Sequence, residues 1–423
     1  MRNLLLVCTF AYLNAQTAFA QNRPVPAVAQ STPFAVTNAK IHVGNGQVLQ
    51  NKAIVVENGK ITAISDVAPA NMTVIDATGK EVYPGFIATN TLLGLRDVDA
   101  VRAMNDYAEV GALNPNARAV IAYNADNRIN PTVRAMGVLL AQTAPVGGTI
   151  SGKSSVFELD GWNWDDAVYK IDDGMHLNWA NLYQTSGWWA EPGATVRNKD
   201  YDESVQRIKQ YFAEAKAYSA AKKPTYNARF EAMRGVFSES ENLYIHVSNA
   251  KGILDAVHFA KAHTKKIVLV GAEDAWRVAD FLVENQVSVI LDETNRLPDR
   301  TDDDIDLPYK MPALLAAKGV PFTFSINGAW EQRDFVFQAG QAIGFGLAYE
   351  KAVEAGTLAA ARILGIDKTV GSIEVGKDAT FIICSGDIFE PRLGAVQQAF
   401  IRGKNIDLGN VQKTMYERYK NRK

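Results

Sequence analysis

The second half of the chain alternates short apolar runs with longer amphipathic segments. The apolar runs Leu243–Val247 and Lys266–Val270 precede the segments Ala250–His263 and Glu273–Asn285, whose apolar residues recur at helical spacing, and Val287–Leu291 is a further apolar run. Strands that alternate with helices of this length predict βα units and a parallel sheet. Nearly continuous apolar strands are typical of a sheet covered on both faces.

The same alternation continues toward the C-terminus. Met311–Lys318 is predicted to be a short helix, Val320–Ile326 a strand and Phe335–Glu350 a helix. Four such units before a C-terminal helix fit half of an eight-unit barrel. An open, doubly wound sheet is the alternative, although no glycine-rich dinucleotide loop follows the first strand.

The first half of the barrel has a weaker pattern. The helix Glu203–Lys222 has Val205, Ile208, Phe212 and Ala215 at helical spacing. The candidate strands are Phe86–Thr89, Ala117–Ile121, Gly137–Ala141 and Ser154–Leu159.

Short strands with turn signals occupy both ends of the chain. Asn58-Gly59, a strong hairpin signal, lies between Ala53–Glu57 and Ile61–Ile64. The N-terminal strands are too few for a stable sheet, so we expect the strand-like segments Ala379–Cys384 and Gln397–Ile401 to complete it.

The first residues have the features of a secretory signal. One Arg precedes an apolar stretch and Ala18-Phe19-Ala20, which predicts a signal peptide over 1–20 and a polar, disordered leader over 21–33. The apolar run Leu4–Leu13 is too short to span a bilayer. We therefore expect a periplasmic or secreted protein without a membrane span, in which Cys384 is the single remaining cysteine and no intrachain disulfide forms.

Composition adds bounds on the partners. The chain has 423 residues, of which 47% are hydrophobic. It contains 44 basic and 46 acidic residues, which gives a net charge of -2. This balance is typical of a globular protein and gives no indication of a nucleic-acid partner. A small molecule or a short peptide is the expected ligand.

One motif links these patterns to a known family. Residues 83–94 read YPGFIATNTLLG, with the flanks IDATGKEVYPGFI and GSIEVGKDATFII. This resembles the amidohydrolase superfamily, closest to its imidazolonepropionase-like branch. The resemblance implies a (β/α)8 TIM-type barrel over 83–370, with a small β-sandwich built from 34–82 and 371–423.

The same resemblance identifies candidate catalytic residues and shows a degraded metal site. The family's first strand reads PGFIDxHxH, whereas Ala88, Asn90 and Leu92 stand here at the Asp and the two His. His246 falls at the His of the fifth strand, and Asn327 replaces the catalytic Asp of the eighth. Gly271 falls near the sixth-strand His, and Lys153 is a weak candidate for the fourth-strand ligand. The candidates are His246, Asn327 and Asn90; a hydrogen-bonded barrel residue is the alternative for His246.

Further candidates come from the segment Gly161–Trp189 and from the seventh strand. The segment holds five of the seven tryptophans, and its residues His176, Trp188 and Trp189 are candidate binding residues. An insertion that packs its aromatic residues onto the barrel is the alternative. Glu293 follows the seventh strand and could perform acid–base chemistry or pair in a loop salt bridge.

Three functions remain open from the sequence. The first is an amidohydrolase that acts on carbon–nitrogen bonds of small amides or dipeptides, with a single weakly held divalent metal such as zinc or no cofactor. The second is a catalytically inactive binding protein. The third is a structural partner of an intact amidohydrolase, as a hetero-oligomer; a homo-oligomer is also open.

Overall fold

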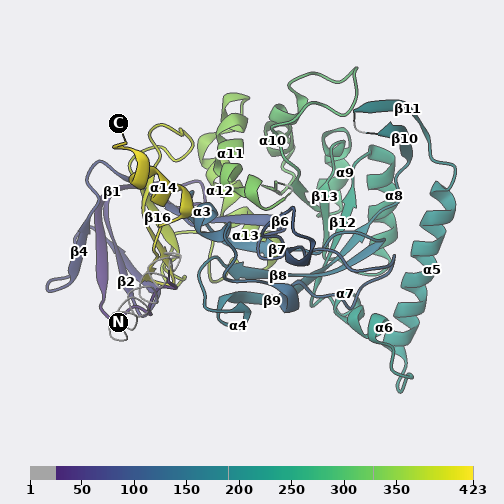
Figure 1. Cartoon of the computed structure of the whole chain (residues 1–423), viewed down its shortest axis with the longest axis horizontal. Coiled ribbons are helices and arrows are strands. Elements are labelled where there is room, and N and C mark those ends of the chain that lie inside the picture. Colours follow the sequence, from purple (N-terminus) through teal and green to yellow (C-terminus); the bar gives the residue numbers. More distant parts are fainter. Residues whose placement is uncertain (1–24, 189, 327, 423) are drawn as a thin grey trace, which may run out of the picture.

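The computed structural model describes residues 25–188, 190–326 and 328–422. The predicted signal peptide, Trp189 and Asn327 lie outside these residues. Figure 1 shows two main parts side by side, a β unit at one end and a larger α/β unit beside it. Residues 25–33 of the predicted leader form no helix or strand, but the Ala27 N–H donates to Asp160 Oδ2 at 2.9 Å. No described helix has both the length and the apolar character needed to cross a membrane.

Both chain ends build the smaller unit, as predicted. β5 (Glu81–Pro84) pairs with β16 (Phe381–Cys384) in antiparallel register, with Ile382 opposite Tyr83, which joins segments some three hundred positions apart. The sheet order is β18-β17-β16-β5-β1-β2-β3, with β4 beside β1. Its strands are β1 (Phe34–His42), β2 (Val48–Glu57), β3 (Lys60–Ser65), β4 (Thr73–Asp76), β5 (Glu81–Pro84), β16 (Phe381–Cys384), β17 (Val396–Ile401) and β18 (Lys404–Asn405).

The terminal sheet closes over its own core. Asn58 and Gly59 have positive φ, 51° and 77°, as a tight hairpin turn between β2 and β3 requires. Lys60 then bridges to Asp378, just before β16, so the hairpin returns to the C-terminal strands. The apolar side chains enclosed in this way include Ile54 and Phe381, which are fully buried.

The larger unit is a barrel of eight strands. Its order is β15-β14-β13-β12-β9-β8-β7-β6, and Thr89 bridges to Ser325 to bring the two edges together. The Ser325 hydroxyl donates to Thr89 O at 2.9 Å across this closure. The strands are β6 (Phe86–Thr91), β7 (Val138–Thr143), β8 (Ile150–Glu158), β9 (Val168–Asn178), β12 (Asn242–Val247), β13 (Ile267–Gly271), β14 (Ser288–Leu291) and β15 (Phe322–Phe324).

Three details correct the sequence interpretation. β8 is antiparallel to both neighbours, because residues 144–149 are too short a connection for a parallel crossover. β9 lies inside the tryptophan-rich segment, so Gly161–Trp189 is no mere insertion but supplies a barrel strand. Ala117–Ile121, predicted to be a strand, instead leads into the short helix α2 (Ala119–Ala122).

Helices surround the barrel (Figure 1). The predicted helix Glu203–Lys222 is confirmed as α5, whereas Phe335–Glu350 is interrupted where Gly346 takes a φ of 103°. The other helices are α3 (Asn130–Arg134), α4 (Trp164–Ala167), α6 (Ala228–Ala232), α7 (Arg234–Phe237), α8 (Ala250–Lys261), α9 (Ala279–Glu284), α10 (Leu307–Lys318), α11 (Phe335–Gly344), α12 (Tyr349–Gly356), α13 (Leu358–Leu364) and α14 (Val411–Tyr419), with α5 spanning Tyr201–Ala220 and 3-10 turns at Arg102–Met104, Ala275–Val278 and Trp330–Asp334.

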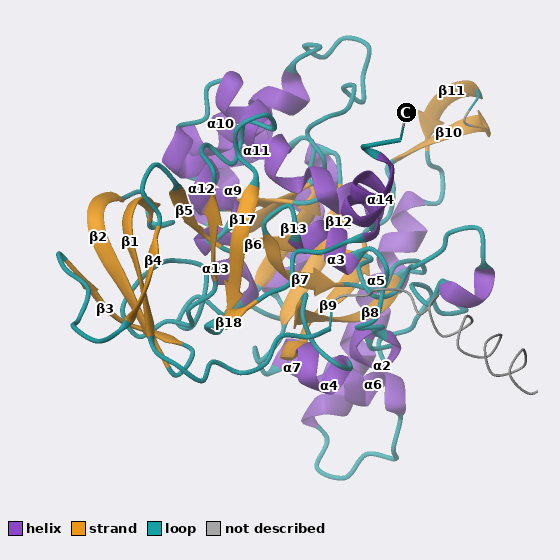
Figure 2. Cartoon of the chain, turned by 60° about the vertical axis from the view of Figure 1, so that its left-hand side comes forward, coloured by secondary structure: helices purple, strands orange, loops and turns teal. Residues whose placement is uncertain are grey.

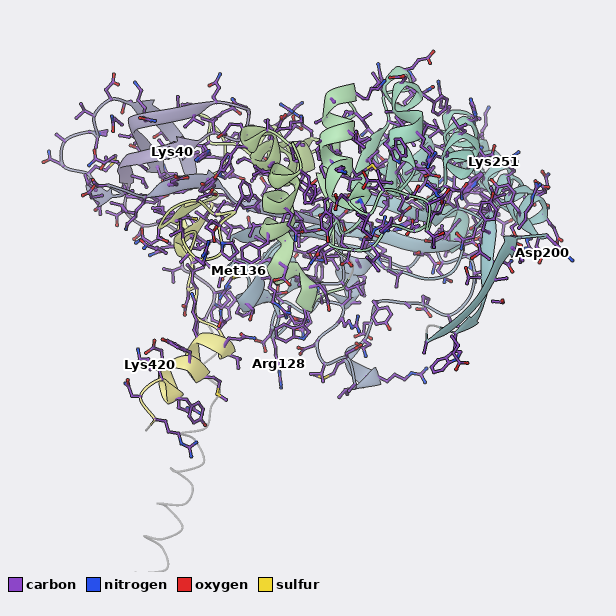
Figure 3. All side chains as sticks on the ribbon, turned by 90° about the horizontal axis from the view of Figure 1, so that it is seen from above. Lys40, Arg128, Met136, Asp200, Lys251 and Lys420 are labelled. Carbon is purple, nitrogen blue, oxygen red and sulfur yellow. The ribbon has the colours of Figure 1, made fainter. Side chains whose placement is uncertain are left out.

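A two-stranded hairpin stands apart from both sheets. It consists of β10 (Tyr183–Trp188) and β11 (Glu191–Arg197), which pair only with each other among the described strands. Figure 2 shows it projecting beyond the helices of the barrel. In Figure 3, Lys40 marks the terminal sheet, and Asp200 and Lys251 mark the opposite end of the molecule.

Candidate ligand site at the barrel mouth

The mouth of the barrel lies at the C-terminal ends of its parallel strands, where barrel enzymes place their reactive groups. The structure brings together two of the predicted residues there, His176 on β9 and His246 on β12. Asn90 lies on β6, and Glu293 lies in the loop after β14. Trp188 is on the hairpin, and Trp189 and Asn327 are outside the described residues.

His176 and His246 form a direct hydrogen bond. Their strands are parallel neighbours, with His176 opposite Tyr244 and His246 opposite Asn178, and Nδ1 of His176 lies 2.9 Å from Nε2 of His246. Burial lowers the pKa of His246 to about 4. Burial also lowers the pKa of His176 well below its usual range, and a positive charge on His246 would lower it further. Both rings are therefore neutral near pH 7, and one N–H donates to the other ring's lone pair.

A buried polar network continues from this pair into the barrel. The His176 ring stacks on Tyr244, with centroids 4.7 Å apart, and Tyr244 donates to Asp173 Oδ2 at 2.6 Å. Gln142 Nε2 donates to the same oxygen at 2.8 Å. Gln142 lies on β7 and Tyr244 on β12, and the strands β8 and β9 lie between them in the sheet. Their side chains therefore meet across the concave side of the sheet. Burial raises the pKa of Asp173, whose Oδ1 has no partner among the described residues.

The network reaches the first strand at Asn90. The backbone N–H of Asn90 donates to Gln142 Oε1 at 3.0 Å, and Asn90 has a φ of 51°, a left-handed conformation that Asn tolerates better than most residues. Two residues later, the Leu92 N–H donates to Gly328 O at 3.2 Å. The residues that replace the expected histidine pair are thus part of the ordered strand end.

Glu273 is a site residue that sequence reasoning missed. It follows β13 directly, after Gly271 and Ala272, which have φ of 83° and 51°, and it lines a cavity of about 300 Å³. Burial raises its pKa to about 7, and its Oε2 has no partner among the described residues. The sequence interpretation placed this residue at a helix N-terminus. Its position in the sequence could have identified it, because an acidic residue directly after a barrel strand lies at the barrel mouth.

Other charged side chains line the cavity beside Glu273. The neighbouring Asp274 forms an ion pair with Arg300, whose Nη2 lies 2.6 Å from Oδ1. Glu273 differs from it in having no ion pair within residues 25–188, 190–326 and 328–422. Burial, followed by the charge of Asp292, raises the pKa of Glu293, which lies outside this cavity lining. The other lining residues are Asn181, Leu182, Tyr183, Thr195, Ser248, Asn249 and Asp299.

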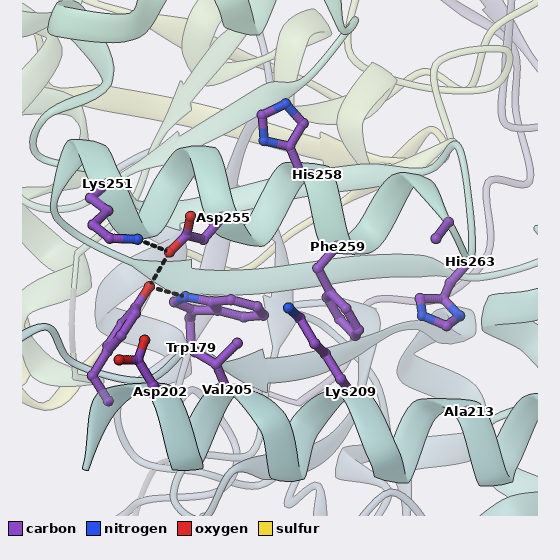
Figure 4. Close-up of a pocket in the computed structure, with 12 residues that line it drawn as sticks. Trp179, Asp202, Val205, Lys209, Ala213, Lys251, Asp255, His258, Phe259 and His263 are labelled. Atoms are coloured by element: carbon purple, nitrogen blue, oxygen red, sulfur yellow. Dashed lines mark hydrogen bonds and ion pairs between the residues drawn. The ribbon is translucent and has the colours of Figure 1, made fainter.

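A second hollow lies outside the barrel, between α5 and α8 (Figure 4). Its volume is about 650 Å³, and Trp179 lies between the two helices. Trp179 Nε1 donates to the Tyr201 hydroxyl at 3.2 Å, and that hydroxyl donates to Asp255 at 2.6 Å. The backbone N–H of Trp179 donates to His246 O at 3.0 Å, which fixes this groove relative to the mouth.

The residues of the mouth do not fit a catalytic zinc ion. Over residues 25–188, 190–326 and 328–422, no group of three or more His, Cys, Asp or Glu side chains is placed to share a metal ion. Catalytic zinc sites use three protein ligands of this kind. His176 and His246 supply two imidazoles, but one lone pair between them already accepts a hydrogen bond.

Comparison with known proteins decides the family. The sequence model of the Amidohydrolase family matches residues 121–414, more than half of the chain. The chain belongs to the amidohydrolase family. Its resemblance to the imidazolonepropionase-like branch is supported by an imidazolonepropionase of Picrophilus torridus, which is 23% identical over 416 residues and covers 86% of this chain and 94% of that protein.

Solved structures share this amidohydrolase fold. An amidohydrolase from Thermotoga maritima MSB8 superposes with a TM-score of 0.77 at 19% identity, covering 88% of this chain and 99% of that one. A Xaa-Pro dipeptidase with methionine bound in its active site has a TM-score of 0.55 at 14% identity, covering 89% and 100%. These likenesses support the barrel fold that the structure shows for this chain.

Proposed function

We propose that this amidohydrolase-family chain binds a small amide or a short peptide at the barrel mouth and has lost the metal-dependent hydrolysis of its family. The His176–His246 hydrogen bond of 2.9 Å carries the proposal. An imidazole binds a metal through a free lone pair, and this hydrogen bond occupies one of the two lone pairs that the neutral histidine pair supplies. At the positions of the family's two histidines, Asn90 adds one weak neutral oxygen donor and Leu92 adds none.

The cavity supplies the recognition chemistry. Asn181, Ser248 and Asn249 offer amide and hydroxyl groups, which pair with the N–H and C=O of an amide ligand. A volume of about 300 Å³ lies at the small end of ligand pockets, the size of an amino-acid amide or a dipeptide. Glu273 is the acceptor for a ligand amino group, because a cation beside it would offset the cost of burying its charge.

Metal-independent hydrolysis is the second candidate function. Glu273 has a pKa of about 7, so half of the molecules carry the carboxylate at neutral pH, as a general base requires. As a general base, the carboxylate would accept a proton from a water molecule that attacks the carbonyl carbon of the amide. The role of structural partner to an intact amidohydrolase remains a third candidate. The predicted signal peptide supports the proposal that the protein acts in the periplasm or outside the cell.

Calorimetric titration of the chelator-treated protein tests the proposal. We expect dipeptides and amino-acid amides with a free amino group to bind, N-acetylated forms to bind about tenfold or more weakly, and Glu273→Gln to remove this discrimination. Asp299→Asn is the matched control, because Asp299 lines the same cavity but is paired with Arg296 at 2.7 Å.

The outcomes separate the candidates. Product release by the chelated protein that stops in Glu273→Gln would replace the binding role with metal-independent hydrolysis. Absence of binding by every ligand, together with co-purification of an intact amidohydrolase, would favour the structural role instead.

A further inference from the structure

We infer that the C-terminal helix α14 lies on the surface of an anionic lipid bilayer and holds this protein there. None of the residues of α14 (Val411–Tyr419) is buried against the rest of the described chain. Figure 3 shows the helix projecting away from the body of the molecule, with Lys420 near its end. Nine helical residues extend over about 14 Å, less than half of the hydrocarbon thickness of a bilayer, so α14 would lie along the surface and not cross it.

Apolar side chains form one stripe along α14. Val411, Met415 and Tyr419 are four residues apart, which places them on the same face of the helix. Tyr416 lies beside this apolar stripe. All four side chains are between 45% and 66% exposed, so the barrel does not cover them. The stripe is therefore available to a partner outside the described chain.

The helix is formed and anchored before any partner binds. The Asn410 side chain caps it by accepting a backbone N–H of the first turn at 2.8 Å. The Thr132 hydroxyl on α3 donates to Gln412 Oε1 at 2.8 Å, which ties the first turn to the barrel. At the other end, the Arg422 N–H donates to Tyr419 O at 3.0 Å and continues the turn. A preformed helix loses less conformational entropy on binding than a disordered tail would.

The charges of this stretch are complementary to an anionic partner. Residues 411–422 contain four basic residues and one acidic residue, a net charge of +3 in a chain whose net charge is -2. Lys420 pairs with Glu417, so the net positive charge comes from Lys413, Arg418 and Arg422. At about 100° per residue, Arg418 lies on one side of the apolar stripe and Lys413 on the other, and Arg422 follows its C-terminal end.

This arrangement of charges around an apolar stripe favours a bilayer over other anionic partners. The long stems of Lys and Arg let their charges reach the lipid headgroups while the stripe enters the boundary between headgroups and acyl chains. Tyr is favoured at the same depth, because its ring is apolar and its hydroxyl is polar. A nucleic acid would neutralise the charges but leave Val411, Met415 and Tyr419 in water.

Co-sedimentation of the full chain with lipid vesicles is the first arm of the test. We expect binding to vesicles of phosphatidylglycerol and phosphatidylcholine to be about tenfold or more tighter than to phosphatidylcholine alone, and to weaken as salt is added. Arg418→Gln/Arg422→Gln should remove most of this preference. Lys222→Gln/Lys223→Gln is the matched control, because it removes two exposed charges after α5 and should leave binding unchanged. All variants keep residues 1–20, so any lipid contact of the predicted signal peptide is common to them.

The second arm tests the apolar stripe without changing the charge. Met415→Ser/Tyr419→Ser should weaken binding to the anionic vesicles about tenfold, because two side chains no longer enter the interface. Tyr226→Ser is the matched control, since Tyr226 is 76% exposed on the loop before α6 and should leave binding unchanged. Thermal unfolding should be the same for all these proteins, because none of the changed side chains is buried.

Three results would overturn the inference. The first is equal binding to neutral and anionic vesicles, and the second is binding that either α14 variant leaves unchanged. The third is tight binding of single-stranded DNA that Arg418→Gln/Arg422→Gln weakens and Met415→Ser/Tyr419→Ser does not, which would show a polyanion site in place of a bilayer contact.

Discussion

Nδ1 of His176 and Nε2 of His246 lie 2.9 Å apart, so the two imidazoles at the base of the barrel mouth bond to each other. Their hydrogen bond links β9 to β12 in addition to the backbone pairing, and Tyr244 stacks on the His176 ring. Because the two rings are neutral and buried, the stability of the folded protein should depend on pH.

The histidine pair should make the protein acid-sensitive. Both rings have a lowered pKa when folded, about 4 for His246, against about 6.5 when unfolded, so the unfolded state binds more protons below pH 6.5. The free energy of unfolding should fall as pH drops from about 6.5 to about 4, by up to about 1.4 kcal/mol per pH unit for each ring.

Urea unfolding at pH 7 and pH 5 measures this effect. The double variant His176→Phe/His246→Phe should lose less stability between the two pH values than the unmodified protein. His258→Phe is the control, since that histidine lies on α8, outside the barrel interior. An equal loss in the double variant and the unmodified protein would show that the pair does not titrate as described.

Glu273→Gln should stabilise the protein at alkaline pH. Burial raises the pKa of this carboxyl from 4.5 to about 7, so the folded state binds its proton more tightly. Its contribution is fully present below pH 4.5 and is lost as pH rises through 7, a loss of up to about 3 kcal/mol. Thermal or urea unfolding should show a gain for the variant at pH 8 and almost none at pH 4.5. A gain that is independent of pH would place the effect elsewhere.

Arg402 should couple the terminal sheet to the barrel. Its Nε lies 2.7 Å from Oε1 of Glu158, a buried carboxylate at the end of β8 whose pKa burial raises to about 7. Arg402→Met should cost about 1–3 kcal/mol, because the carboxylate loses its closest cation, and Glu158→Gln in the same chain should restore most of it. Arg392→Met is the control, since Arg392 is 87% exposed beside Glu390. Additive effects of the two substitutions would contradict the coupling.

Removing residues 371–423 should unfold the terminal sheet. The deletion takes away β16, and with it the antiparallel partner of β5 and the buried Phe381. The remaining strands would expose the apolar faces that these residues cover, so we expect aggregation in light scattering. A soluble, cooperatively unfolding truncation would rule out a shared sheet.

Local pattern was sufficient to predict much of this fold. The hairpin at Asn58-Gly59, the long helix α5 and the apolar strands β12 to β14 follow from turn chemistry and periodicity, which depend on adjacent residues. β9 was missed because its sequence, VYKIDDGMHLN, is polar on the side that faces the barrel interior. β8 likewise contains Ser, Gly and Lys, although all nine of its residues are buried.

The site was less predictable for a different reason. His246 could be placed on its strand, but the contact with His176 joins positions seventy residues apart and depends on β9 being its neighbour. Glu273 depends on two successive left-handed residues, of which Ala272 is not a residue type that signals such a turn. Both features come from tertiary structure that a single sequence does not encode locally.

The metal content of the purified protein tests the central claim most directly. Elemental analysis without added metal should find well under one zinc per chain, and the variant Asn90→His/Leu92→His/Asn327→Asp should bind more, since it restores the donors expected at three family positions. Full zinc occupancy of the unmodified chain, with hydrolysis of a small amide that a chelator abolishes, would contradict the account.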